Sequence, residues 1–193
     1  MHDWVLAVER AYVVAATGTP AVREAGPPAD PHDDRLPRAF AAAGAVASRY
    51  LAVGTPRTLG LVIHGGHSAE AAMLSHAAHA TWFTPREVRV AGLGADLLAH
   101  SLDGRAVPLE EALACDIVCV HAPIAIAATQ LRRGTHVNVL AAATLDDELA
   151  KLASVTHEVP GLGALAAGFV DGRQLDELTV FVIGDGSIAL SAL

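Results

Sequence analysis

Short, continuously apolar runs alternate along the chain with longer stretches in which apolar residues recur at helical spacing. The run over residues 58–63 ends at glycines, which is typical of a strand buried on both faces of a parallel sheet. Further strands are predicted at residues 87–91, 116–120, 136–140 and 178–183, and helices at residues 4–16, 39–52, 69–82 and 108–113. This alternation predicts an α/β fold with a Rossmann-like, doubly wound, mostly parallel sheet.

The same pattern divides the chain into two parts. Residues 1–54 are predicted to form an amino-terminal helical segment, and residues 55–193 a Rossmann-like domain. A Pro-rich stretch at residues 26–37 lies inside the first part. Its prolines lack a backbone donor and its carboxylates favour solvent, so a linker is predicted there.

Composition indicates a folded protein and narrows its partners. Of the 193 residues 52% are hydrophobic, and the mean hydropathy is +0.39, so the chain can bury a full α/β core. Its 13 basic and 21 acidic residues give a formal net charge of -8, which repels nucleic-acid phosphates and anionic lipid surfaces. We therefore expect no nucleic-acid partner and no membrane association.

The cysteines and the chain start bear on the compartment. Cys115 and Cys119 lie in an apolar run, where we expect buried thiols and no disulfide framework. The sequence offers no run of about 18 apolar residues, and Met1-His2-Asp3 lacks the basic start of a signal peptide. These features favour a cytoplasmic protein.

A glycine turn follows the first predicted strand. In His64-Gly65-Gly66-His67-Ser68-Ala69, Gly66 and Ala69 take the second and third small-residue places of a dinucleotide-binding turn, whereas His64 stands in the first. The next strand ends in Ala91-Gly92, with no carboxylate or guanidinium for a ribose. The turn is therefore either a plain strand–helix connection or a site for NAD or NADP. The candidate cofactor-binding residues are Gly65, Gly66, His67, Ser68, Ala69, His121, Ala122 and Pro123.

Several segments together resemble the ornithine cyclodeaminase and mu-crystallin family. They are Arg133-Gly134-Thr135-His136-Val137-Asn138, with Ala114-Cys115-Asp116-Ile117-Val118 before it, the helix at residues 41–52, residues 176–181 and the opening helix around residues 8–12. The resemblance implies a Rossmann domain beside a substrate domain, NAD(H) or NADP(H) as cofactor, amino acids or cyclic imines as substrates, and a dimer.

The chain is shorter than that plan requires, chiefly between Pro31 and Leu36, so its amino-terminal helices resemble the remnant of a lost substrate domain. By the same resemblance, Ala39 stands where the family holds the substrate carboxylate with an arginine. Ala143 stands where the family has its catalytic aspartate, and the single lysine, Lys151, lies on a polar helix face. A methyl group transfers no proton, so this comparison argues against the parental reaction.

Three histidines offer a different chemistry. His64, His67 and His121 follow strands that should be neighbours, and converging imidazoles could ligate zinc or supply a general base. The alternative is that these side chains fill space that a cofactor occupies in the family. No metal ligand is assigned.

Three functions therefore stay open. The first is a shortened relative without the parental catalysis, a pseudoenzyme that acts as a binding or partner subunit in amino-acid-related metabolism. The second is an NAD(P)-dependent oxidoreductase or cyclodeaminase acting on an amino acid or cyclic imine, and the third is histidine-based chemistry. Without a substrate domain, the helix faces around Tyr12 and Phe40 should be exposed, which favours a homodimer or a partner protein. A small-molecule ligand is compatible with each function.

Overall fold

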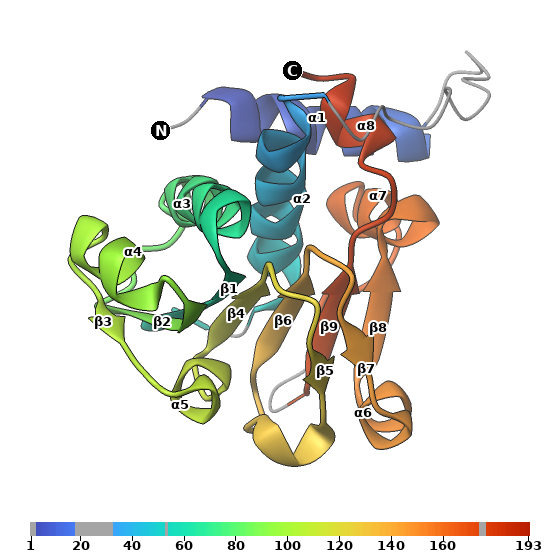
Figure 1. Cartoon of the computed structure of the whole chain (residues 1–193). Helices are drawn as coiled ribbons and strands as arrows, with labels where there is room; N and C mark the ends of the chain where they lie inside the picture. The colour runs from blue at the N-terminus through green and yellow to red at the C-terminus, as the bar shows by residue number, and fades with distance from the viewer. Residues whose placement is uncertain (1–2, 18–32, 53, 174–176) are drawn as a thin grey trace.

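The computed structural model describes residues 3–17, 33–52, 54–173 and 177–193. Within them the chain forms a seven-stranded sheet of order β3-β2-β1-β4-β6-β9-β8, in which all neighbours run parallel (Figure 1). The strands are β1 (Thr58–His64), β2 (Glu87–Leu93), β3 (Arg105–Ala106), β4 (Ile117–Val120), β6 (His136–Val139), β8 (Ser154–His157) and β9 (Thr179–Val182). The predicted Rossmann-like α/β fold is confirmed.

The central strands are buried because both faces of the sheet are covered. All four residues of β4 and of β6 are buried, as the continuous apolar runs predict. On one face lie α1 (Asp3–Thr17), α2 (Leu36–Leu51), α3 (Gly66–His79), α7 (Gly163–Ala166) and α8 (Ser187–Leu190). Against the other lie α5 (Leu109–Leu113), α6 (Asp147–Leu152) and a small parallel pair, β5 (Ala125–Ile126) and β7 (Thr144–Leu145).

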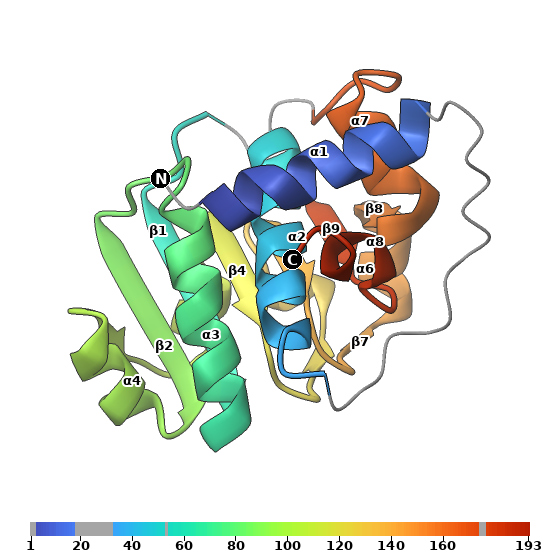
Figure 2. The same cartoon turned by 90° about the horizontal axis from the view of Figure 1, so that it is seen from above.

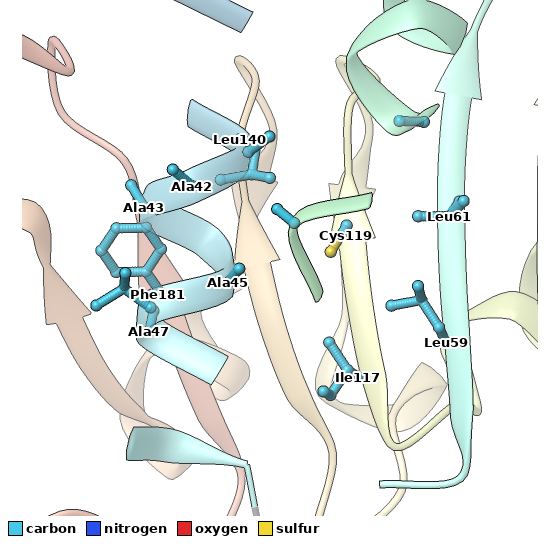
Figure 3. Packing of buried hydrophobic residues seen from close by; sticks show 14 of the residues in the cluster. Ala42, Ala43, Ala45, Ala47, Leu59, Leu61, Ile117, Cys119, Leu140 and Phe181 are labelled. Carbon is cyan, nitrogen blue, oxygen red and sulfur yellow. The ribbon is translucent and has the colours of Figure 1, made fainter. Parts of the chain in front are cut away.

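Small residues let α2 approach the sheet closely. A Cβ added at Gly44 would lie 3.2 Å from Leu140 Cδ1, and the neighbouring alanines are buried. Figure 3 shows Phe181 beside the α2 alanines, with Leu59, Leu61, Ile117 and Cys119 in the same apolar layer. The helix predicted at residues 39–52 begins earlier, at Leu36, because Pro37 fits the first helical turn. Residues 36–37 are therefore helix, and residues 26–32 of the predicted linker lie outside the described residues.

The expected exposure of the helix faces around Tyr12 and Phe40 is wrong. Seen from above, α1 crosses α2 and lies against α7 and α8 (Figure 2). Tyr12 is fully buried, and Phe40 is half-buried, with ring atoms close to Gly186 at the start of α8. The carboxyl-terminal helices supply the cover that the sequence pattern did not reveal. Whether residue 54 marks a domain boundary stays a prediction, and α1 and α2 share one hydrophobic cluster with β1 and β4.

Several elements differ from the predicted ones or were not predicted. The helix predicted at residues 69–82 begins at Gly66, so the glycine turn is shorter than expected. The 3-10 segment Ala128–Gln130, helix α4 (Ala95–Ser101) and the π-helical turn Glu158–Leu162 join the strands. No helix in the described ranges combines the length and apolar character that crossing a membrane requires.

Candidate functional site

The turn after β1 is held in place by hydrogen bonds to the neighbouring strand and within itself. Gly65 adopts φ +92°, and its N–H donates to the Leu93 carbonyl of β2 at 3.1 Å. The Ser68 hydroxyl accepts from the His64 N–H at 2.7 Å and lies 2.8 Å from the Gly65 carbonyl, to which it donates. The positive φ explains why glycine stands at position 65. These hydrogen bonds and the backbone of Gly65 define the shape of the turn.

Gly66 opens α3 and faces free space. A Cβ added there would meet no atom within 4 Å, and the residue is exposed. The first N–H groups of a helix have no intrahelical acceptor, and the helix dipole makes this end attractive to anions. An exposed glycine at such a position gives a phosphate room to approach the backbone. Gly66, His67 and Ser68 form the first turn of α3, so these predicted site residues lie together.

The end of β2 lies beside this turn and lacks a polar side chain. Gly92 has φ +112°, and a Cβ there would lie 2.0 Å from the Ile63 carbonyl oxygen, so no other residue fits. Leu93 and Leu97 follow, 69% and 76% exposed. The sequence Ala91-Gly92 predicted that no carboxylate would stand here for a ribose. The backbone geometry at Gly92 explains this absence.

His121 follows β4 but does not face open space. It is 6% exposed, and its Nε2 lies 3.0 Å from Ser75 Oγ in α3. Burial, and secondarily the nearby His79, lowers the pKa of His121 to about 3, so the ring is neutral at pH 7. Ala122 is buried as well, whereas Pro123 is exposed. His121 therefore fixes α3 against the sheet, and its role toward a cofactor stays a prediction.

The three histidines do not form a metal centre. His64 and His67 are exposed, whereas His121 is buried under α3. Across the four described ranges, no group of three or more His, Cys, Asp or Glu side chains is placed to hold a metal ion. The space-filling interpretation agrees with the burial of His121 but not with the exposure of His64 and His67.

A chain of buried hydrogen bonds runs beneath the helices. His79 Nδ1 donates to the Ser75 carbonyl at 2.7 Å, which leaves Nε2 to accept from the Ser48 hydroxyl at 2.9 Å. Asn138 Nδ2 donates to Ser48 Oγ at 2.8 Å, and Asn138 Oδ1 accepts from His136 Nε2 at 3.1 Å. Each bond fixes the direction of the next.

The same chain ends at β9. His136 Nδ1 lies 2.8 Å from Thr179 Oγ1, and the Thr179 hydroxyl donates to the Leu51 carbonyl of α2 at 3.2 Å. Burial lowers the pKa of His79 to about 4 and that of His136 to about 3. The structural role predicted for His136 agrees with these contacts. The network joins α2, α3, β6 and β9.

At the two positions where the resemblance implies chemical residues, 39 and 143, this chain has alanine. Ala39 is fully buried in the core. Ala143 is half-buried in the loop between β6 and β7, and Lys151 is exposed on α6. The two alanines can neither bind a substrate carboxylate nor donate a proton at these positions.

A cavity of about 660 Å³ lies elsewhere, between β8 and α7. Its walls include Leu51, Thr156, Leu165, Val170 and Arg173. The Arg173 Nη1 donates to the Leu51 carbonyl at 3.1 Å, so the guanidinium links this wall to α2. The residues of the glycine turn do not line this cavity.

Comparison with known proteins gives structural likenesses alone. No family model matches the chain, and no curated protein matches its sequence. An archaeal alanine dehydrogenase, a dimer with bound NAD, aligns over 98% of this chain and 88% of its own with TM-score 0.79 and 19% identity. The Thermococcus litoralis Δ(1)-pyrroline-2-carboxylate reductase, in complex with NADH and L-proline, aligns over 82% of this chain with TM-score 0.68 and 20% identity.

A probable ornithine cyclodeaminase from Bordetella pertussis Tohama I aligns over 82% of this chain with TM-score 0.64 and 21% identity. The aligned part is 64% of the reductase and 65% of the cyclodeaminase, so the chain spans just under two thirds of each. At these identities the likenesses show the fold, which is the Rossmann-like α/β fold shared by these dehydrogenases, reductases and cyclodeaminases.

Proposed function

We propose that this chain binds NAD(H) or NADP(H) at the turn between β1 and α3 and acts as an oxidoreductase or cyclodeaminase of amino acids or cyclic imines. The observation that carries the proposal is the open space at Gly66, where an added Cβ would meet no atom within 4 Å. Gly66 is the first residue of a 14-residue helix that follows a central parallel strand.

The topology supports the same place. Strands β2 and β3 extend the sheet from β1 in one direction, and β4 and β6 extend it in the other. Such a reversal next to β1 leaves a crevice beyond the carboxyl ends of β1 and β4, where ligands of doubly wound sheets bind. The named neighbours with NAD or NADH share this sheet architecture, which is why the class of cofactor is proposed for this chain.

The chain's own residues have definite tasks under this proposal. The N–H groups of Gly66 and His67 bind the pyrophosphate, and Ser68 holds the turn in shape through Gly65. The pair His121 and Ser75 positions α3 relative to β4. A bound dinucleotide would supply hydride transfer. No acid or base of this chain is assigned to the substrate.

A second candidate is the binding or partner subunit that lacks the parental catalysis. Ala143 favours it, because a methyl group stands where the family resemblance implies the catalytic aspartate. This candidate needs no turnover and leaves dinucleotide binding open, so binding and turnover must be measured separately.

Thermal unfolding with millimolar NADH and NADPH tests the cofactor. A ligand at one hundred times its dissociation constant stabilises the native state by about 2.7 kcal/mol, which raises the melting temperature by several degrees. The variant Gly66→Asp places a carboxylate in the open space and should abolish the rise without lowering the melting temperature of the free protein by more than a degree or so. Ala80→Asp, at the exposed opposite end of α3, is the matched control and should keep the rise.

Absence of any shift in the wild type would overturn the proposal. NADH oxidation in the presence of a cyclic imino acid, or of a 2-oxo acid with ammonium, then separates the two candidates. Turnover that Gly66→Asp removes supports the oxidoreductase, and binding without turnover supports the partner subunit.

We also propose a homodimer. The archaeal alanine dehydrogenase is a dimer, and this chain exposes the apolar side chains of Val14 and Phe169, 68% and 63% exposed. Size-exclusion chromatography with light scattering should give about twice the chain mass, and a monomer at high concentration would contradict it.

A further inference from the structure

The end of β2 touches the turn that the proposed function assigns to the pyrophosphate. His64 and Leu93 are partners in the β1–β2 register, and the Gly65 N–H donates to the Leu93 carbonyl. A Cβ added at Gly65 would lie 3.8 Å from Leu93 Cδ2, so the leucine side chain lies over the turn. In a sheet of this order, the second strand ends under the adenosine ribose of a dinucleotide bound at the first turn. Leu93, the last residue of β2, is therefore the residue of this strand that would face the ribose.

The backbone prevents a ribose-binding side chain at the preceding residue. At Gly92, φ is +112° and any Cβ would overlap the Ile63 carbonyl oxygen at 2.0 Å. A carboxylate that accepts from the ribose 2′-hydroxyl, as in NAD-specific sites, cannot stand there without moving β1 and β2 apart. The position carries no side chain, for a reason independent of any ligand.

Cations that could hold a 2′-phosphate are committed elsewhere. Arg89 Nη2 pairs with Glu87 Oε2 at 2.9 Å, and Arg105 Nη1 pairs with Glu87 Oε1 at 3.0 Å. Both pairs lie toward the amino end of β2, because Glu87 is its first residue. Asp96, an exposed residue in the first turn of α4, is the remaining full charge between residues 92 and 101, and it lies outside β2.

Exposed apolar side chains follow the end of β2, in place of a ribose-binding carboxylate or a phosphate-binding guanidinium. Leu93 is 69% exposed at the carboxyl end of β2, and Leu97 is 76% exposed in α4, the helix that follows. Apolar surface of this kind can pack against an adenine ring, and it gives no hydrogen bond that depends on the 2′ substituent.

We infer that the adenosine half of the dinucleotide is held here by apolar contact with Leu93 and Leu97, with no side chain of β2 that binds the ribose 2′ position. The site consequently binds NAD(H) and NADP(H) with similar affinity. This inference rests on the proposed function, because it concerns the same cofactor site.

The test is the ratio of the dissociation constants for NADH and NADPH, measured by isothermal titration calorimetry on the full chain at about 0.15 M salt. The wild type should bind both within about a threefold difference, since neither a carboxylate nor a guanidinium distinguishes them. Leu93→Arg adds a guanidinium that can bind a phosphate bidentately, so NADPH should gain about tenfold relative to NADH.

Leu152→Arg is the matched control. Leu152 is 64% exposed at the end of α6, on the other face of the sheet, and arginine there should leave the ratio unchanged. A wild-type preference above about tenfold for either nucleotide, or a ratio that Leu93→Arg does not move, would overturn the inference while the proposed function stands. Failure of the wild type to bind either nucleotide would instead overturn the proposed function itself.

Discussion

Tyr12 donates a hydrogen bond of 2.6 Å to Glu158 Oε1, across 146 residues of chain. The other carboxylate oxygen of Glu158 accepts from the N–H groups of Gly184 and Gly186 at 3.0 and 3.1 Å. Glu158 is 2% exposed and Tyr12 is fully buried, so the carboxylate is satisfied by protein groups alone. Glu158 therefore links α1 to the segments that precede α7 and α8, the two helices that pack against α1.

Tyr12→Phe should destabilise the protein by about 1–3 kcal/mol, because it leaves one oxygen of a buried carboxylate without its donor. Urea denaturation followed by circular dichroism measures the change. Tyr50→Phe is the control, since Tyr50 also donates to a glutamate, Glu9, at 2.6 Å but is only part-buried. Equal effects of the two substitutions would show that burial of Glu158 does not amplify the loss.

Ser48→Ala should be similarly harmful. Ser48 donates to His79 Nε2 and accepts from Asn138 Nδ2, and each buried polar group left without a partner costs about 1–3 kcal/mol. The matched control is Ser101→Ala, because the exposed Ser101 hydroxyl bonds only to the Leu97 carbonyl of its own helix. Chemical denaturation should give a loss for Ser101→Ala within about 0.5 kcal/mol of zero. A loss at position 48 no larger than that would contradict the hydrogen-bond chain.

Acid should unfold the protein through its buried histidines. Burial holds the pKa of His79 at about 4 and those of His121 and His136 at about 3, below the ordinary value of 6.5. The unfolded chain therefore binds more protons between these values, so stability is complete above pH 6.5 and falls as the pH decreases toward 4. Each histidine adds up to about 1.4 kcal/mol per pH unit to the slope, or roughly 4 kcal/mol for three.

The free energy of unfolding at successive pH values between 7 and 4 checks this slope. His121→Asn should flatten it by about one third, whereas His100→Asn, at an exposed position of α4, should leave it as it is. A slope that His121→Asn does not change would mean that His121 is protonated in the folded protein.

The two glycines at the candidate site should respond in opposite ways to alanine. Gly66→Ala puts a Cβ into open space at the start of a helix and should stabilise the free protein by up to about 1 kcal/mol. Gly92→Ala meets a carbonyl oxygen at 2.0 Å and a positive φ, so a loss on the order of 2–4 kcal/mol or failure to fold is expected. The melting temperatures of the two variants measure these effects. If Gly92→Ala leaves the melting temperature unchanged, the backbone does not explain why the end of β2 lacks a side chain at position 92.

The strands were predictable wherever burial on both faces leaves a continuous apolar run. The runs in β1, β4 and β6 are of this kind. The edge strand β8 is polar and only half-buried, and β3 has two exposed residues, so neither carries that signal. The short helices α7 and α8 owe their place to contacts with α1, which no local pattern contains.

The candidate site was predictable in its backbone and less so in its side chains. The glycine turn lies after β1 as expected, and Gly66 opens the helix. The position of His121 under α3 follows from strand alternation, because residues two apart in a strand point to the same face. Cys119 points to the face covered by α2 and α3, so His121 points there too. The strained backbone of Gly92 could not be predicted, since it depends on where the Ile63 carbonyl lies in space.

Backbone NMR titration with NADH reports where on the protein the dinucleotide lies as well as whether it binds. We predict saturable shifts of the amide signals of Gly65, Gly66, His67 and Ser68, with Leu93 also affected, and no comparable shifts in the Gly66→Asp variant. An unchanged spectrum at millimolar NADH, or shifts confined to the cavity between β8 and α7, would contradict the account.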